Sequence, residues 1–181
     1  STRLNLKKCS IFNSQSTSFI QLKDITEETA AFFMKAPDNN LLQFILSKKA
    51  ILVEGDAEFM MMDFFYRKAL NKSLDSAGVD VIAVDGKCFK RYLEIARVIG
   101  VKTAVITDND KSYQKNIQEA YAGYMNNEYP TIRVFSDKND ERYTFEVCVY
   151  ADNTGICDTA FGEHLRKHSV PEYMLANKAE C

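Results

Sequence analysis

Acidic residues follow two short apolar runs in this 181-residue chain. Glu54 and Glu58 come after the run 51–53, and Asp108 and Asp110 come after a second run that lies further along the chain. Carboxylates brought together in one place repel one another unless hard cations neutralise them. Ligand sets made only of oxygen suit Mg²⁺ or Mn²⁺, and Mg²⁺ is usually held by a few carboxylates together with substrate phosphates. The acids therefore predict a site for divalent cations.

The first pair of acids requires a strand followed by a helix. The run 51–53 is continuously apolar, as a strand buried on both faces requires, and Gly55 permits a tight turn into the next helix. Glu54 is then expected at the strand tip, and Glu58 in the first helical turn. In an open α/β sheet, ligands bind beyond the carboxyl ends of the strands, which is where these two side chains are predicted to lie.

The second pair of acids follows a strand that ends at Ile106, and it is predicted at the same edge of the sheet. Asp108 and Asp110 are two residues apart in a segment expected to be extended, so their side chains should point to one side. Further strands are expected at 79–84 and 131–135, which gives an α/β fold with a four-stranded, mainly parallel sheet. Amphipathic helices are expected to flank it, one of them at 112–125. In the helix predicted at 58–74, five large side chains are expected to be buried: Phe59, Met60, Met62, Phe64 and Phe65.

Residues 1–49 differ in pattern from the rest of the chain and predict a short α+β appendage. Two strand-like segments flank a polar turn at 13–18. A helix is expected to begin after Thr26 as N-cap and to end at Pro37. Asp38 is expected to cap a second helix with one apolar face, formed by Leu41, Leu42, Ile45 and Leu46.

At the acidic residues, the sequence resembles a known family. VEGDAE, followed by TDND, looks like the paired motifs of the Toprim domain, the metal-binding module of topoisomerases, bacterial primases and certain nucleases. The longer segments ILVEGDAE and VDGKCFKRYLEIARVIGVKTAVITDND are similar to the Toprim half of the OLD (overcoming lysogenisation defect) family of ATP-dependent nucleases. That family includes the nuclease subunit of Gabija-type antiphage systems. The resemblance covers residues 50–181.

The resemblance implies two domains in a fragment of a longer protein. Residues 1–49 would be the end of an ATPase-like domain with its connecting helices, and residues 50–181 a C-terminally truncated Toprim nuclease domain. An N-terminal extension that packs on the Toprim domain is the alternative interpretation of residues 1–49. No GxxxxGK[ST] phosphate loop occurs in the sequence, so this fragment is not expected to bind ATP.

The resemblance also adds site residues near the end of the chain. It implies that Glu146, in TFEVC, is a further metal ligand, although the same segment also fits an alternating strand with this glutamate facing solvent. Family members often carry a second acid two residues later, where this chain has Cys148. Lys178, in ANKAE, matches a lysine that reaches the scissile phosphate in OLD nucleases; alternatively, it is a solvated surface lysine.

The implied function is a metal-dependent DNA endonuclease of antiphage defence, which nicks or cuts DNA by two-metal phosphodiester hydrolysis. The catalytic residues would be Glu54, Asp108, Asp110 and Lys178, and the metal ligands Glu54, Glu58, Asp108, Asp110 and Glu146. The cofactors would be Mg²⁺ or Mn²⁺, with two ions bound. The alternatives are another Toprim enzyme, such as a primase or topoisomerase piece, and a non-catalytic scaffold that binds DNA or a partner protein.

The composition sets limits on partners and location. The net charge of −2 excludes a uniformly basic nucleic-acid-binding surface, so DNA binding would depend on metals and local patches. Lys87 and Lys90, near a strand end, are candidate phosphate contacts, whereas such lysines usually mark only a solvated helix face. The resemblance implies further partners: an ATPase half of the same protein, a second copy in a homo-oligomer, and a helicase subunit in the Gabija type.

No apolar run is long enough to span a bilayer, and no signal peptide is recognisable at the start, so a cytoplasmic location without membrane association is expected. The five scattered cysteines indicate reduced thiols. His164 and His168 are four residues apart, but no third zinc ligand accompanies them, which favours surface histidines.

Overall fold

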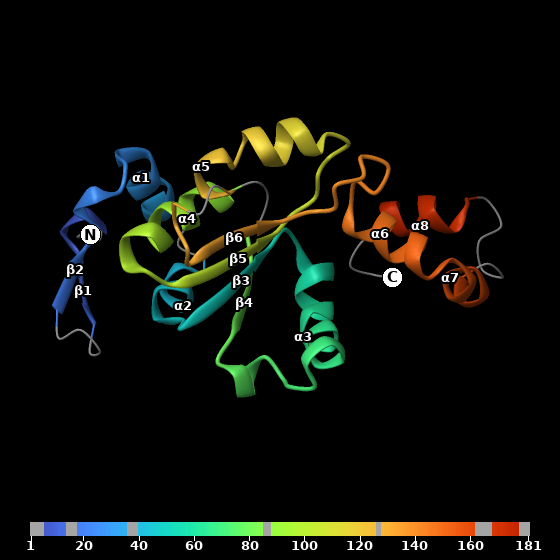
Figure 1. Ribbon diagram of the computed structural model, residues 1–181, viewed down its shortest axis with the longest axis horizontal. Helices are drawn as coiled ribbons and strands as arrows, with labels where there is room; N and C mark the ends of the chain where they lie inside the picture. The colour runs from blue at the N-terminus through green and yellow to red at the C-terminus, as the bar shows by residue number, and fades with distance from the viewer. Residues whose placement is uncertain are drawn as a thin grey trace.

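The computed structural model describes residues 6–13, 18–35, 40–84, 88–125, 128–161 and 168–177. Figure 1 shows a central sheet with helices on both faces and a separate group of helices near the C-terminus. The strands are β1 Ser10–Asn13, β2 Ser18–Gln21, β3 Lys49–Val53, β4 Asp80–Ala83, β5 Lys102–Ile106 and β6 Ile132–Phe135. The α-helices are α1 Glu27–Lys35, α2 Leu41–Leu46, α3 Asp56–Leu70, α4 Phe89–Ile99, α5 Ala122–Met125, α6 Phe145–Asp152, α7 Thr154–Phe161 and α8 Val170–Ala176.

The four-stranded sheet has the order β4-β3-β5-β6, and all of its neighbouring strands are parallel. Leu52 of β3 is aligned with Ile82 of β4 on one side and with Val105 of β5 on the other. All three side chains are fully buried. Because β3 and β5 are adjacent and end at the same edge, the acids that follow them are brought together. The predicted α/β fold with a four-stranded parallel sheet is confirmed.

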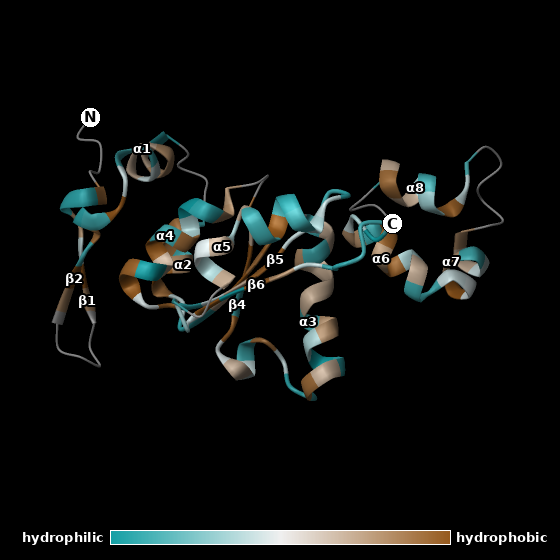
Figure 2. Cartoon of the chain, turned by 45° about the horizontal axis from the view of Figure 1, so that its top comes forward, coloured by the Kyte–Doolittle hydropathy of each residue, from teal (hydrophilic) through white to brown (hydrophobic). Residues whose placement is uncertain are grey.

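The two faces of the sheet are covered to different extents. One face carries Leu52, Ile82 and Val105, and these belong to a large core cluster that includes side chains of α1, α2 and α4. The opposite face carries Val53, which packs with Met62 of α3 in a smaller cluster. In Figure 2 brown is clearest on the central strands β4 and β5, and the helices carry both teal and brown residues, as amphipathic helices do.

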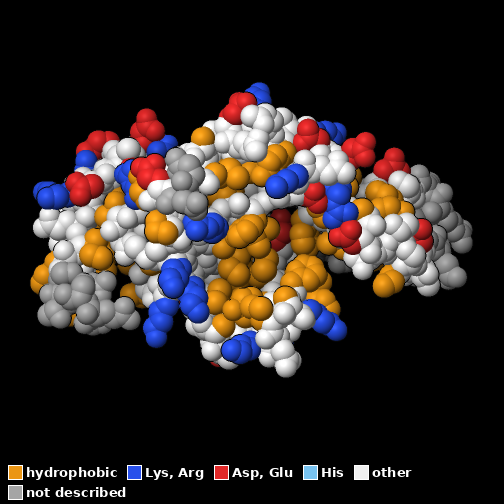
Figure 3. All heavy atoms as spheres, in the orientation of Figure 1, with side chains coloured by type: hydrophobic (Ala, Val, Ile, Leu, Met, Phe, Trp, Pro, Cys, Tyr) orange, Lys and Arg blue, Asp and Glu red, His pale blue; other side chains and the backbone are white. Residues whose placement is uncertain are grey.

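Helix α3 leaves much of its apolar surface in solvent. Met62 is buried, but Phe59, Met60 and Phe64 are about half exposed, so the prediction that all five large side chains are buried is wrong for these three. The reason is that a helix with apolar side chains around most of its circumference can bury only the side that meets the sheet. Apolar side chains gather in the middle of this face of the molecule (Figure 3). A pocket of about 400 Å³ is lined there by sheet residues that include Ala104 and Phe135.

The N-terminal residues form the predicted α+β appendage. Strands β1 and β2 make an antiparallel pair. Thr26 caps α1 as predicted, because its hydroxyl accepts a hydrogen bond from the backbone N–H of Thr29 at 3.2 Å. Leu41 and Phe44 of α2 are buried, whereas Leu42 and Leu46 are 71% and 80% exposed, so the apolar face predicted for this helix is wrong at those two positions. Pro37 and Asp38 lie outside the described residues, and the two-domain division stays a prediction.

Two later segments differ from expectation. The helix predicted at 112–125 is a π-helical turn, Gln114–Glu119, followed by the short α5. Residues 145–152 form helix α6, so the alternating strand considered for this segment is wrong. Helices α6, α7 and α8 share a small core cluster of their own, with Cys157, Val170 and Met174 buried in it. Cys9, Cys88, Cys148 and Cys157 are free thiols, as predicted. Within the part of the chain that the structure describes, no helix is both long and apolar enough to cross a membrane.

Candidate metal centre

A pocket of about 280 Å³ lies where β3 and β5 end, beside the N-terminus of α3 and helix α6. Four of the predicted acids line it: Glu54, Glu58, Asp108 and Glu146. They come from four different elements or their ends, far apart in the sequence, yet they meet at one edge of the sheet. Of the four acids expected to meet at this edge, Glu54, Glu58 and Asp108 line the pocket, and Glu146 joins them from α6. Their roles as metal ligands remain predictions.

Glu54 follows the last residue of β3 and is tied to the neighbouring strand. The hydroxyl of Thr107 donates a hydrogen bond to Oε2 of Glu54 at 3.3 Å. Gly55, which caps α3, has φ −147° and ψ −170°, an extended conformation that any residue adopts. The turn into α3 therefore does not use the backbone freedom of glycine. A Cβ at this position would lie 3.5 Å from Oε2 of Glu58, so the glycine leaves the space beside that carboxylate open.

Glu58 lies in the first turn of α3 and is only 7% exposed. Burial raises the pKa of its carboxyl, and the nearby charges of Glu146 and Glu54 raise it further. The backbone N–H groups of Glu58 and Gly55 act in the opposite direction but do not cancel the shift. Glu58 is therefore a carboxylate whose negative charge is costly in this pocket, and a bound cation would remove that cost.

Asp108 and Asp110 are not placed alike. Strand β5 ends at Ile106, and the backbone turns into the left-handed region at Asp110 and Lys111, with φ 49° and 66°. The prediction of an extended segment with both aspartates on one side is therefore wrong. Asp108 lines the acidic pocket, whereas Asp110 is exposed and is not among the residues that line it. The turn is the physical reason, because two residues in this conformation reverse the direction of the chain.

Glu146 reaches the pocket from the first turn of α6. The hydroxyl of Thr144 caps this helix by accepting a hydrogen bond from the backbone N–H of Val147 at 3.4 Å. Glu146 is 5% exposed, which excludes the alternative of a solvent-facing position. The position expected to hold a second acid carries Cys148, whose thiol pKa is raised by burial. The neutral thiol therefore does not replace a carboxylate at neutral pH.

The donor set of the pocket fits a hard divalent cation. It consists of carboxylate oxygens, the ligands that Mg²⁺ and Mn²⁺ prefer, and the raised pKa of Glu58 indicates uncompensated negative charge. Among the described residues, however, no three His, Cys, Asp or Glu side chains are close enough together to hold one ion as they stand.

The sequence of this edge of the sheet matches a known family. Residues 45–110 match the family described as "Overcoming lysogenization defect protein-like, TOPRIM domain". This stretch is an OLD-like Toprim domain. It contains β3, α3, β4, α4 and β5, and it supplies Glu54, Glu58 and Asp108 to the acidic pocket.

Proteins to which this chain is similar come from a phage and a bacterium. The Old nuclease of Escherichia phage P2 is 30% identical over 73 residues, which span 40% of this chain and 12% of the phage protein. A structure of the C-terminal region of the OLD protein from Xanthomonas campestris pv. campestris, phased with platinum, has a TM-score of 0.49 and 21% identity. It covers 76% of this chain and 72% of the bacterial one. The iodine-phased structure of the same region has a TM-score of 0.44 and 20% identity, over 75% and 74% of the two chains.

Two of the three lysines predicted to contact DNA, Lys87 and Lys178, lie outside the described residues, as does His164, which is predicted to be a surface histidine. Lys90 is exposed on α4, and its ammonium lies 5.5 Å from the ring centre of Tyr121. Burial and the nearby charge of Glu54 raise the pKa of Tyr121 to about 12, which places this tyrosine close to the acidic pocket.

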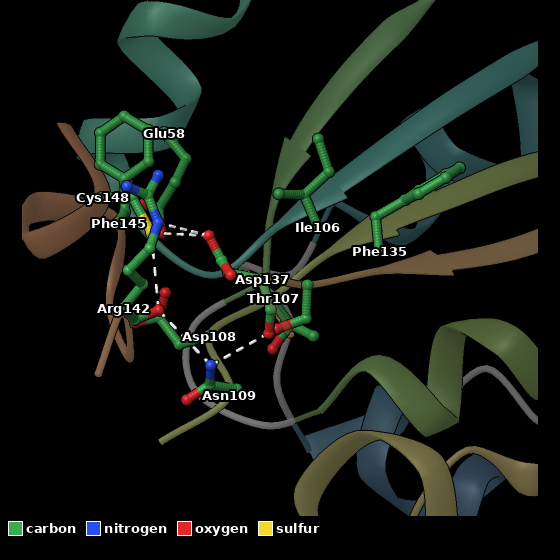
Figure 4. Close-up of a pocket in the computed structure, with 11 residues that line it drawn as sticks. Glu58, Ile106, Thr107, Asp108, Asn109, Phe135, Asp137, Arg142, Phe145 and Cys148 are labelled. Atoms are coloured by element: carbon green, nitrogen blue, oxygen red, sulfur yellow. Dashed lines mark hydrogen bonds and ion pairs between the residues drawn. The ribbon is translucent and has the colours of Figure 1, made fainter. Parts of the chain in front are cut away.

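Sequence reasoning misses several polar residues that organise the OLD-like Toprim site. In the sequence, Asn109 is only a spacer between two acids, and residues 136–142 are only a polar loop. Figure 4 shows Asn109, Asp137 and Arg142 on the wall of a second pocket, which shares Glu58 and Asp108 with the acidic one. The Asp and Asn residues of SDKNDER are the sequence feature that could have indicated an ordered loop, because these side chains hydrogen-bond to nearby backbone groups in turns.

Proposed function

We propose that this chain is the nuclease part of an OLD-family protein and that it hydrolyses DNA phosphodiester bonds with two Mg²⁺ or Mn²⁺ ions. The observation that carries the proposal is the convergence of Glu54, Glu58, Asp108 and Glu146 on one pocket of an OLD-like Toprim fold. The name of the phage relative, an Old nuclease, supports the choice of reaction. The proposal includes cleavage by nicking or by cutting both strands, and a role in antiphage defence.

Each side chain of the pocket would have a distinct role. Glu54, Glu58, Asp108 and Glu146 would hold the cations, and Asp110 would join them from the turn that follows β5. When bound, such cations polarise a phosphate, stabilise the leaving oxygen and lower the pKa of a water molecule. Glu54, at the tip of β3 and hydrogen-bonded to Thr107, would accept or donate a proton at its carboxylate. Lys178 would contact the scissile phosphate.

The proposal also assigns partners. DNA would approach the edge of the sheet where the acids lie, and Lys87 and Lys90 would contact its backbone beside the pocket. An ATPase half of the same protein, a second copy and a helicase subunit are further proposed partners, and the cytoplasm is the proposed location. The fragment itself would not bind ATP.

Cleavage of supercoiled plasmid tests the proposal. The protein is incubated with Mg²⁺ or Mn²⁺, alone and as part of a longer protein with its ATPase half, and is compared with Asp108→Asn and Glu54→Gln. We expect metal-dependent nicking or linearisation that both substitutions abolish. Asp75→Asn is the matched control. Asp75 is an exposed aspartate that lines neither the acidic pocket nor the second pocket, so it should tolerate the same change. Cleavage that survives both pocket substitutions would refute the assignment.

A non-catalytic scaffold that binds DNA or a protein partner is the second candidate. It is favoured by the absence, among the described residues, of three ligands already close enough to hold one ion. The same assay separates the two candidates. Retention of labelled DNA without cleavage, in both the shorter and the longer protein and with either metal, would support the scaffold.

A further inference from the structure

Helix α6 supplies Glu146, but it belongs to a different packing unit from the sheet. The buried side chains of α6, α7 and α8 form their own small cluster, separate from the clusters on the two faces of the sheet. In Figure 1 these helices lie beyond the edge of the sheet and are reached through the segment that follows β6. The distance between Glu146 and Asp108 therefore depends on what holds residues 136–144, here called the β6–α6 loop, against the end of β5.

Asn109 is the main polar tie between β5 and this loop. Its side chain is 1% exposed. Its Nδ2 donates to the carbonyl oxygens of Asp137 at 3.0 Å, Asn139 at 2.9 Å and Arg142 at 3.4 Å. Its Oδ1 accepts a hydrogen bond from the backbone N–H of Lys111 at 2.9 Å. One buried amide thus fixes both the β6–α6 loop and the left-handed turn after Asp108.

Arg142 continues the connection from the β6–α6 loop into α6. Its Nε donates to Oδ2 of Asp137 at 2.6 Å. Its two Nη groups donate to the two carboxylate oxygens of Asp152, the last residue of α6, at 2.7 and 2.8 Å. A forked pair of this kind fixes orientation as well as distance. Figure 4 shows Asn109, Asp137 and Arg142 lying one after another along the pocket wall.

Other described contacts also join the β6–α6 loop and α6 to the sheet side: the backbone N–H of Tyr113 donates to Oδ1 of Asp140 at 2.7 Å, and the ammonium of Lys111 lies 4.5 Å from the ring centre of Tyr143. The backbone N–H of Asp110 donates to the carbonyl of Tyr143 at 3.2 Å, and the ring centres of Phe65 and Phe145 lie 6.2 Å apart. None of these contacts uses a buried side-chain amide that bonds three carbonyl groups of the loop, as Asn109 does. Loss of the Asn109 amide would therefore shift the first turn of α6, where Glu146 lies.

We propose that Asn109 is a positioning residue. Through the β6–α6 loop and Arg142, it holds Glu146 beside Asp108 and thereby sets the affinity of the acidic pocket for a divalent cation. The inference rests on the proposed function, because it takes the pocket to be a cation site. It adds that the residue between the two aspartates of TDND is part of the machinery, although it binds no metal itself.

Mn²⁺ binding, measured by electron paramagnetic resonance on the protein without DNA, tests this proposal. Asn109→Ala should weaken Mn²⁺ binding about tenfold, since loss of a residue that orients a ligand costs that much in metal affinity. The same substitution added to Glu146→Gln should cause no further loss, because the ligand that Asn109 positions is already gone. Equal losses in both backgrounds would show that Asn109 does not act through Glu146 and would overturn the proposal.

Asp63→Ala is the matched control. Asp63 also ties a loop to a helix, because its carboxylate accepts hydrogen bonds from the backbone N–H of Leu74 and from Arg67, but it does not line the acidic pocket. Asp63→Ala should lower the midpoint of thermal unfolding and leave the affinity of the protein for Mn²⁺ unchanged. If Asn109→Ala fails to fold, Arg142→Lys replaces it, because lysine keeps the positive charge but cannot form the two parallel hydrogen bonds to Asp152. Arg142→Lys should also weaken Mn²⁺ binding. Normal Mn²⁺ affinity in this variant would overturn the proposal.

The outcomes separate this inference from the proposed function. Normal Mn²⁺ affinity in Asn109→Ala would overturn the inference and leave the nuclease assignment standing. No Mn²⁺ binding by the unsubstituted protein would overturn both. Cleavage lost in Asn109→Ala at low Mn²⁺ and regained at high Mn²⁺ would support both, because a purely structural defect does not respond to the metal concentration.

Discussion

Glu58 and Glu94 are buried to nearly the same extent, 7% and 9% exposed, yet their surroundings shift the pKa values of their carboxyls in opposite directions. Burial alone would raise the pKa of Glu94 as well. Hydrogen bonds from Thr29 and Thr26, together with the charge of Arg97, outweigh burial and lower it. At Glu58 the neighbouring charges are further carboxylates, and they add to the effect of burial.

The difference teaches how to separate a structural carboxylate from a candidate functional one. Oε1 of Glu94 accepts the backbone N–H of Thr26 at 2.6 Å, and its Oε2 accepts the hydroxyls of Thr26 and Thr29. Its charge is thus satisfied within the chain, at the N-terminus of α1. Glu58 shares its pocket with Glu54, Asp108 and Glu146, and its backbone hydrogen bonds do not offset burial and the charges of Glu146 and Glu54. Donor groups, and not burial, distinguish the two sites.

The largest expected effect is on cleavage. Asp108→Asn should reduce metal-dependent DNA cleavage at least about 100-fold, because it removes a charge that the pocket needs to hold cations. Glu94→Gln should leave the cleavage rate per folded molecule within about twofold, since Glu94 contacts the cap of α1 and not the pocket. Initial rates of plasmid nicking, normalised to folded protein by circular dichroism, measure both. A comparable loss in the two variants would break the distinction.

The next effect is on stability, and here Glu94 should dominate. Glu94→Ala removes the acceptor of the buried Thr29 hydroxyl and of the backbone N–H and hydroxyl of the exposed Thr26, which should cost about 2–3 kcal/mol in the free energy of unfolding. Urea unfolding followed by circular dichroism measures this cost. Glu119→Ala is the control, since Glu119 is exposed and should change the free energy by less than about 0.5 kcal/mol.

A smaller effect of opposite sign is expected at Glu58. Without metal, Glu58→Gln should raise the midpoint of thermal unfolding by about 2–4 °C, because it removes a buried charge that faces other carboxylates. With Mg²⁺ present, the unsubstituted protein should gain stability through binding, and the variant should gain less. Differential scanning calorimetry with and without Mg²⁺ measures both changes. A variant that is less stable in metal-free buffer would contradict the electrostatic account of Glu58.

The smallest effect is on the pH dependence of these differences. The pKa of Glu58 is raised in the folded protein, so the folded state binds this proton more tightly than the unfolded state does. The extra stability of Glu58→Gln over the unsubstituted protein should therefore fade as the pH falls through the raised pKa. It should be gone below the ordinary value of 4.5. The lowered pKa of Glu94 acts in reverse. Its stabilisation is complete above 4.5 and should be lost as the pH falls through the lowered pKa. Metal-free unfolding curves at several pH values should show both trends.

The sheet was predictable because its strands are continuous apolar runs, such as 51–53, and because parallel strands place the residues after them at one edge. Glu54, Glu58 and Asp108 follow from this rule. Glu146 has two interpretations in the sequence, since TFEVCVY alternates in the manner of a strand. Its helical conformation depends on the Thr144 cap and on packing against α7 and α8, neither of which a local pattern reveals.

The polar ties were not predictable for a related reason. Asn109 donates to carbonyl groups about thirty residues away, in a loop whose fold is set by its own Asp and Asn side chains. Likewise, nothing in the sequence indicates that Asp110 turns into the left-handed region or that Phe59 and Phe64 of α3 stay in solvent. These features depend on which surfaces meet in three dimensions, whereas sequence periodicity reports only which side of one element is apolar.

The cap that Glu94 provides also has a mechanical consequence. Besides the bonds of Glu94, Arg91 of α4 donates to Thr29 at 3.1 Å and to Glu28 at 3.0 Å, so a cluster of polar bonds fastens the first turn of α1 to one side of α4. A force applied to α1 would have to break this cluster or carry α4 along with it. The bonds therefore couple any displacement of α1 to α4.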